Sequence, residues 1–370
     1  MINTTRSLSA TLLSVIFLQV ITFNSAKAAI DKELDRNFIN ISDIKKAISP
    51  FEEKGFKGII TVADKNGAIY KKAFGQAING KAKYTSSTVV DIASVTKQFT
   101  AAAVLKLMEQ GKISLNAPIG KYIGNVPKDK REITIHQLLT HTSGLKRHSG
   151  RDEEAISMEE FLKRALSSKL AFGVGEKYHY SNIGYSMLAS LIEILSGQSF
   201  EDYLFQNLFK PAEMFSTGYE RPDWTSRTIP ELSTPYAGFN SPLKMVQGMN
   251  GNYWNLLGGG GILTTSEDMV LWHQALLDNK ILTKNSKELL FTPYTQEEEE
   301  GYYYGYGWSI VPKESSEPLI WHNGMSFFGK AEYWRMPQSG FMIFVASHEG
   351  NVEPWQIAKA LYDTLPFHKE

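Results

Sequence analysis

The sequence contains no cysteine among its 370 residues. The protein therefore has no disulfide, no thiolate metal ligand and no cysteine that could carry a lipid anchor. It also lacks an excess of charge of one sign, because 39 lysine and arginine residues balance 39 aspartate and glutamate residues. This balance argues against a nucleic-acid partner. The one strong charge run, at residues 297–300, consists of four glutamates and is typical of a solvated loop.

Long hydrophobic runs are absent except at the N-terminus. There a basic residue, Arg6, precedes an apolar run over residues 10–23, and Ala26-Lys27-Ala28 follows as a small-x-small cleavage site. This order predicts a signal peptide over residues 1–28 and export to the periplasm or the medium. An uncleaved membrane anchor is the alternative, although polar residues interrupt the run.

The remaining chain is long enough for one large domain with a substantial core. Strand patterns occur at both ends, with a hairpin expected over residues 58–74 and later strands at 258–263, 306–311, 319–322, 330–336 and 341–347. Helices are expected between them, at 134–139, 158–166, 182–195 and 200–209. The stretch 222–255 lacks clear periodicity and is expected to form loops.

These patterns predict an α/β (α+β) fold, in which an antiparallel sheet flanked by helices is split by a helical insertion. The α/β part would span about residues 29–130 and 256–370, and the insertion about residues 131–255. A cleft is expected where the two parts meet.

The stretch Ala93-Ser94-Val95-Thr96-Lys97 opens an apolar-periodic run that ends at a glycine. Residues three apart on a helix have Cβ atoms about 5–6 Å apart, so Ser94 and Lys97 would stand side by side in the first turn. A serine hydroxyl becomes a good nucleophile when a base removes its proton. A lysine can be that base if burial or a nearby cation lowers its pKa. The alternative is a serine that only caps a helix.

Two further segments carry polar residues where a strand or loop meets another element. Tyr180 and Asn182 lie just before a predicted helix, and His322 and Gly324 end a late predicted strand. Taken alone, these are a partly buried tyrosine, a helix cap and an ordinary strand end. His136 and His141 straddle a helix end with no third ligand nearby, so the sequence indicates no metal site and no cofactor.

Together, Ser94-x-x-Lys97, Tyr180-x-Asn182 and a His-x-Gly pair ending at Gly324 resemble the motifs of the serine β-lactamase and penicillin-binding superfamily. The order is most similar to the class C β-lactamase, DD-peptidase and esterase branch. The flanking segments 133–145 and 259–269 are also similar to this branch. The resemblance covers the chain from about residue 56 to the C-terminus, and it implies a β-lactamase/transpeptidase-like fold.

The resemblance implies a role for each matched residue. Ser94 would be the nucleophile that carries the acyl group, and Lys97 would accept or relay its proton. Tyr180 would act as general acid or base, with its phenolate favoured by the nearby ammonium. Asn182 would hold the lysine and the substrate amide. The backbone N–H groups of Ser94 and Met325 would form the oxyanion hole.

The last motif departs from the β-lactamase pattern. β-Lactamases of this branch have a lysine at the position of His322, where it faces the substrate carboxylate as a permanent cation. Histidine is mostly neutral at pH 7 and resembles the DD-peptidase, D-amino-acid peptidase and esterase members. Gly324 would let the substrate approach the strand edge closely.

We therefore expect an exported serine hydrolase that works through an acyl-enzyme on Ser94. Its first expected substrate is a D-amino-acid peptide, as for a DD-carboxypeptidase, and its partner in each case would be a small peptide, ester or β-lactam. The alternatives are a carboxylesterase, a β-lactamase, or a penicillin-binding scaffold protein that does not turn over a substrate.

Overall fold

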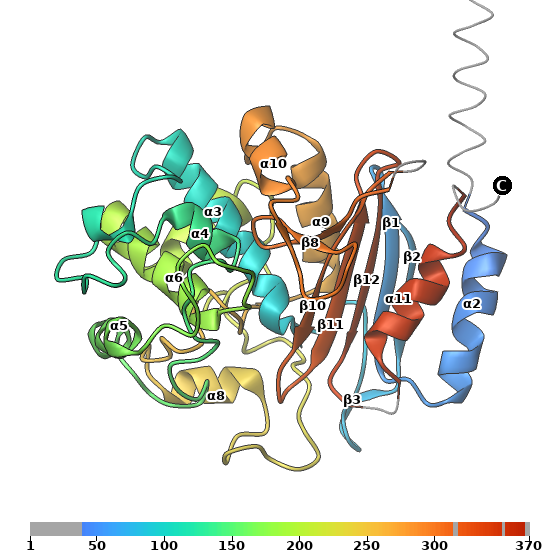
Figure 1. Ribbon diagram of the computed structural model, residues 1–370. Helices are drawn as coiled ribbons and strands as arrows, with labels where there is room; N and C mark the ends of the chain where they lie inside the picture. The colour runs from blue at the N-terminus through green and yellow to red at the C-terminus, as the bar shows by residue number, and fades with distance from the viewer. Residues whose placement is uncertain (1–38, 314–316, 350–351, 367–370) are drawn as a thin grey trace, which may run out of the picture.

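The computed structural model describes residues 39–313, 317–349 and 352–366. The expected signal peptide, residues 1–28, lies outside this range. Among the described residues, none of the helices combines the length and the apolar character that a membrane span requires. Figure 1 shows a twisted sheet in the middle of the molecule, with two helices on one side and a larger group of helices on the other.

One antiparallel sheet of eight strands forms the α/β part of the fold, in the order β2-β1-β12-β11-β10-β9-β8-β7. Its strands are β1 (Gly58–Asp64), β2 (Gly67–Phe74), β7 (Thr295–Gln296), β8 (Tyr303–Tyr304), β9 (Ser309–Val311), β10 (Leu319–Met325), β11 (Lys330–Met336) and β12 (Phe341–Ser347). The expected hairpin is confirmed, because β1 and β2 pair directly across the turn. The sheet therefore joins the beginning of the chain to its end.

One face of the sheet is covered by α2 (Ile41–Glu53) and α11 (Pro354–Tyr362). The buried residues Ile44 and Ile48 are four apart, so they form one apolar stripe on α2. They share a core with Ile60 and Val62, which alternate along β1 and point to the same face. Burial on both faces explains why this strand is apolar except for Thr61 and its last residue, Asp64.

The other face meets the helical part of the chain through α3 (Lys97–Glu109) and α9 (Ser266–Leu277). Ten of the thirteen residues of α3 are buried, so this helix runs through the core. The helices around it are α4 (Ile135–Leu139), α5 (Met158–Ser167), α6 (Asn182–Ser196), α7 (Phe200–Leu204), α8 (Pro242–Gly248) and α10 (Lys284–Leu290). This arrangement confirms the expected fold of an antiparallel sheet with a helical region.

Two local expectations were wrong. Residues 258–263 do not form a strand, because only the short β6 (Leu263–Thr264) pairs, with β5 (Val90–Asp91). Gly258 and Gly261 have φ of 77° and 85°, which breaks the extended conformation. The stretch 222–255 contains a helix as well as loops, since Ser241 caps α8 and Pro242 begins it.

The packing of α3 predicts a large effect of Phe99→Ala on stability. Phe99 is fully buried, with its ring 4.8 Å from that of Trp272 and 5.2 Å from that of Phe209. We expect the substitution to lower the free energy of unfolding by about 3–5 kcal/mol in urea titrations, because it leaves a cavity. Ile194→Ala, at a 43% exposed position, is the control and should cost less than about 1 kcal/mol. Equal effects of the two variants would contradict this account of the core.

Candidate active site

Ser94 lies in a 3₁₀ turn, η1 (Ala93–Thr96), that leads directly into α3. Side chains three apart eclipse each other in a 3₁₀ turn, which brings Lys97 over Ser94. The Nζ atom of Lys97 lies 3.3 Å from Oγ of Ser94, a distance suited to proton transfer. The structure therefore brings the expected nucleophile and base together, with Ser94 one turn before the α-helix proper.

Lys97 is fully buried although it carries an amine. Its Nζ donates a hydrogen bond of 2.6 Å to the carbonyl oxygen of Gly259, and it lies 4.7 Å from the centre of the Tyr180 ring. Burial holds the pKa of this amine well below its usual value, and the positive charge of Arg147 lowers it further, while Asp152 acts in the opposite direction. A lysine in this environment can accept the proton of Ser94 near neutral pH.

Tyr180 lies just before α6 and faces the same pair. Burial raises the pKa of its phenol, while a hydrogen bond with Ser94 and the charge of Arg147 lower it to a smaller extent. The phenolate expected beside an ammonium is therefore not favoured, because the neighbouring lysine is itself held toward its neutral form. At neutral pH Tyr180 is a protonated phenol that can donate a proton to a leaving group.

Asn182 is the first residue of α6, directly after the capping residue Ser181. Its Nδ2 lies 3.4 Å from Nδ1 of His148, and its Oδ1 is buried without a hydrogen-bond partner in the described part of the chain. The expected contact with Lys97 is not made, since the lysine donates to the carbonyl of Gly259 instead.

His322 is the fourth residue of β10 and is buried, with 3% of its surface exposed. Its Nε2 accepts a hydrogen bond of 3.0 Å from the Tyr304 hydroxyl, and its Nδ1 donates one of 2.6 Å to the carbonyl oxygen of Asn323. Burial, with a smaller contribution from Lys97, lowers the pKa of the ring to about 3. His322 is therefore neutral near pH 7, with both ring nitrogens engaged by the protein.

Gly324 lets β10 approach the turn that carries Ser94. A Cβ atom at this position would lie 2.1 Å from the carbonyl oxygen of Ile92, which no side chain could accommodate. The next residue, Met325, is the last of β10 and has a 73% exposed side chain. β11 pairs with β10 as far as Met325, but β9 pairs with it only over residues 319–321, so on the β9 side this end of β10 has no strand partner among the described residues. Its backbone is thus available to a substrate.

Asp91 was missed by the sequence analysis, and it links the two halves of the expected oxyanion hole. One carboxylate oxygen accepts a hydrogen bond of 2.8 Å from the N–H of Ala93, and the other accepts one of 2.6 Å from Oγ of Ser326. These donors adjoin Ser94 and Met325, whose N–H groups would bind the oxyanion. The feature of the sequence that could have pointed to Asp91 is that a single aspartate stands in the apolar run before Ser94.

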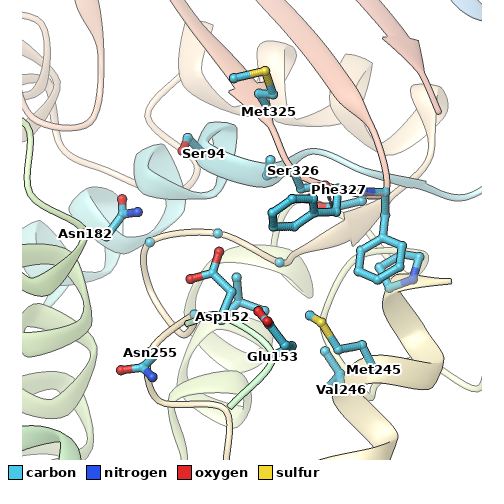
Figure 2. Close-up of a pocket in the computed structure, with 18 of the residues that line it drawn as sticks. Ser94, Asp152, Glu153, Asn182, Met245, Val246, Asn255, Met325, Ser326 and Phe327 are labelled. Carbon is cyan, nitrogen blue, oxygen red and sulfur yellow. Dashed lines mark hydrogen bonds between the residues drawn. The ribbon is translucent and has the colours of Figure 1, made fainter. Parts of the chain in front are cut away.

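Two cavities meet at Ser94, and Arg147 and Met325 also line both. The smaller, of about 420 Å³, includes Asn182 and is shown in Figure 2. The larger, of about 680 Å³, includes Tyr180 and His322. Ser94 is therefore accessible from both cavities, so a substrate bound there could place the group on one side of the scissile bond in one cavity and the group on the other side in the second cavity.

The two other histidines singled out in the sequence have structural partners. Nδ1 of His136 lies 2.8 Å from the Tyr306 hydroxyl, and Nδ1 of His141 accepts a hydrogen bond of 3.0 Å from the N–H of Ser181. His141 is fully buried and thus positions the loop that carries Tyr180.

Comparison with known proteins identifies the family. The family model described as Beta-lactamase matches residues 44–362, so the chain belongs to the β-lactamase family. It is 26% identical over 337 residues to the putative penicillin-binding protein PbpX of Bacillus subtilis (strain 168), covering 90% of this chain and 80% of that protein. It is 27% identical to penicillin-binding protein 4* of the same organism, covering 74% of this chain and 64% of that protein.

Solved structures share the fold. An octameric penicillin-binding protein homologue from Pyrococcus abyssi is similar with a TM-score of 0.75 and 24% identity, over 89% of this chain and 80% of that one. A D-amino acid amidase from Ochrobactrum anthropi SV3 has a TM-score of 0.69 and 19% identity, over 89% of this chain and 99% of that one. At these identities the likeness establishes the fold alone.

The Asp91 bridge predicts that Asp91→Asn and Ser326→Ala both slow acylation. Ser326→Ala removes the link between the two oxyanion donors, and Asp91→Asn replaces one of the two accepting oxygens by a group that can only donate. A misplacement of about 1 Å can cost about 100-fold in rate. We expect each to lower the initial rate of p-nitrophenyl acetate hydrolysis about 10- to 100-fold with little change in melting temperature. The double variant should be no worse than the more impaired single variant. Additive losses would show that the two side chains act separately.

The buried neutral His322 predicts a specific loss of stability in acid. The unfolded chain binds a proton at this histidine below about pH 6.5, whereas the folded chain does so only near pH 3. The free energy of unfolding should therefore decrease as the pH is lowered from about 6.5 to about 3. In His322→Gln, its slope between about pH 5.5 and pH 4 should be smaller by about 1.4 kcal/mol per pH unit. Identical slopes in urea titrations would contradict a neutral His322.

Proposed function

We propose that this member of the β-lactamase family is a serine hydrolase that cleaves the amide bond of a D-amino-acid peptide through an acyl-enzyme on Ser94. The observation that carries the proposal is the fully buried Lys97, whose Nζ lies 3.3 Å from Oγ of Ser94. Burying an amine here is unfavourable unless the amine is neutral, and a neutral amine is the base that the serine needs.

The reaction follows from these positions. Lys97 accepts the proton of Ser94 as its Oγ attacks the carbonyl carbon, and the N–H groups of Ser94 and Met325 bind the oxyanion. The phenol of Tyr180 gives its proton to the leaving nitrogen and regains one from Lys97, which restores the neutral amine. A water molecule then attacks the acyl-enzyme ester. Tyr180 and Lys97 take up the proton of the water and return a proton to Oγ of Ser94.

Two observations favour a peptide or amide substrate over a β-lactam. His322 is neutral, so β10 supplies no permanent cation to hold a β-lactam carboxylate. Two proteins of similar fold are a D-stereospecific amidohydrolase and a D-amino acid amidase. Action as a DD-carboxypeptidase belongs to the same proposal, although the terminal carboxylate of its substrate would likewise meet no permanent cation on β10. Export to the periplasm or the medium through residues 1–28 is also part of it. A carboxylesterase remains the alternative activity for this site.

The test is the labelling of Ser94. The purified protein is incubated separately with a fluorescent penicillin, p-nitrophenyl acetate and a D-Ala-D-Ala peptide, and adducts are located by intact-mass and peptide mass spectrometry. We expect an adduct on Ser94 and turnover of the peptide, both abolished in Ser94→Ala. Ser87→Ala, a change at an exposed serine seven residues away, is the control and should behave as wild type.

Each outcome separates the candidates. Faster turnover of the acetate than of the peptide would favour the esterase. A stable penicillin adduct without turnover of any probe would favour the scaffold protein that binds but does not hydrolyse. Turnover that survives Ser94→Ala would refute the acyl-enzyme on this residue.

A further inference from the structure

The smaller cavity beside Ser94 carries two neighbouring carboxylates with different surroundings. Figure 2 shows Asp152 and Glu153 on one loop, with the Asp152 carboxylate directed into the cavity on the side of Ser94. Glu153 lies nearer to Met245 and Val246 of α8, which form an apolar wall. The cavity is thus apolar on one side and acidic toward the nucleophile.

Glu153 is already paired within the protein. Its Oε1 lies 3.1 Å from Nε of Arg151 and accepts a hydrogen bond of 3.2 Å from the Tyr236 hydroxyl. Asp152, in contrast, makes no hydrogen bond and no ion pair with any residue that the structure describes. Its negative charge therefore has no direct partner, although the carboxylate lines a cavity rather than the open surface.

The position of Asp152 is electrostatically costly. Burial raises the pKa of its carboxyl to about 6, with Glu153 and Asp91 raising it further and Lys97 opposing them. A partly desolvated carboxylate without a partner is unfavourable in a folded protein, and such groups gather at sites where a ligand supplies the missing charge. The group that would satisfy Asp152 is a cation with hydrogen-bond donors.

The cavity in which Asp152 lies indicates whether this cation belongs to the acyl group or to the leaving group of the substrate. Tyr180, the proton donor to the leaving group, lines the larger cavity together with His322. The leaving group therefore occupies the larger cavity, and the acyl group occupies the smaller one with Asp152 and Asn182. Arg147, which lines both cavities, lies over the Tyr180 ring at 5.0 Å and carries the wrong sign to bind a cation.

We propose that Asp152 binds a protonated primary amine on the acyl residue of the substrate, while the wall formed by Met245 and Val246 receives an apolar side chain. This inference rests on the proposed function and narrows it. The preferred substrates would be amides or peptides whose scissile D-residue carries a free amine, rather than chains blocked at that position. An ammonium group offers three donors to a carboxylate and forms charge-assisted hydrogen bonds with it.

The test uses p-nitroanilides that differ in the amine. The substrates are D-phenylalanine p-nitroanilide, its N-acetyl derivative, and N-acetyl-D-lysine p-nitroanilide, which moves the amine to the side chain. At pH 7.5, we expect wild-type kcat/KM to be higher for at least one amine-bearing substrate than for N-acetyl-D-phenylalanine p-nitroanilide. A preference for D-phenylalanine p-nitroanilide would show that Asp152 binds an amine on the α-carbon of the substrate. A preference for N-acetyl-D-lysine p-nitroanilide would show that it binds an amine on the side chain.

The variants assign this preference to Asp152. Asp152→Asn should lower kcat/KM for the preferred amine substrate about 10- to 100-fold, mainly through KM, because a charge-assisted pair is lost. It should leave the N-acetyl-D-phenylalanine substrate within about threefold, since that substrate offers no cation. Glu153→Gln is the matched control, because it removes the same charge one residue away from a carboxylate that is already paired.

Three results would overturn the proposal. The first is an equal loss of kcat/KM on all substrates in Asp152→Asn, which would mean that Asp152 acts through Lys97. The second is an equal loss of kcat/KM in Glu153→Gln. The third is a higher wild-type kcat/KM for N-acetyl-D-phenylalanine p-nitroanilide than for either amine-bearing substrate. If the wild type hydrolyses none of these probes, the proposed function fails for this substrate class. Calorimetric binding of D-phenylalaninamide and its N-acetyl derivative to Ser94→Ala, with and without Asp152→Asn, then tests Asp152 alone. Equal binding in both backgrounds would refute it.

Discussion

The burial of one lysine amine constrains the rest of the site. Lys97 has no exposed surface and its Nζ contacts the Gly259 carbonyl and the hydroxyl of Ser94. A charged amine would be unfavourable at this place, which favours the neutral form that the proposed role of Lys97 as base for Ser94 requires. Burial also raises the pKa of Tyr180, and the hydrogen bond with Ser94 and the charge of Arg147 lower it only to a smaller extent, so the phenol stays protonated. Burial thus favours the protonation states that the proposed roles of Lys97 and Tyr180 require.

The fold provides this burial by joining segments that are far apart in the chain. The turn at Ser94 comes from the first part, the loop of Tyr180 from the helical region, and the strand ending at Met325 from the last part. Gly324 allows the strand to contact the turn, and the Asp91 carboxylate ties them together through hydrogen bonds on both sides. Beyond this shared centre the cleft differs on its two sides: Asp152, which pairs with none of the described residues, lies on one side and the neutral His322 on the other.

The sequence predicted the sheet, its hairpin and the meeting of Ser94 with Lys97, because strand alternation and three-residue spacing are local properties. It did not predict the bend at Gly258, since a strand-like composition does not reveal a positive φ. It also missed Asp91 and Asp152. The importance of each depends on what surrounds it in space: Asp91 needs its partner Ser326, and Asp152 is notable because its carboxylate has no hydrogen-bond or ion-pair partner among the described residues.

The most direct test of this account is the pKa of Lys97 itself. Lysine labelled with ¹⁵N at Nζ can be followed by NMR as the pH is changed, with Lys97→Met used to assign the resonance. The account predicts one lysine that titrates well below all the exposed lysines and that is missing from the variant. If Lys97 instead titrated together with the exposed lysines, it would be an ammonium at neutral pH, and its role as the base for Ser94 would be refuted.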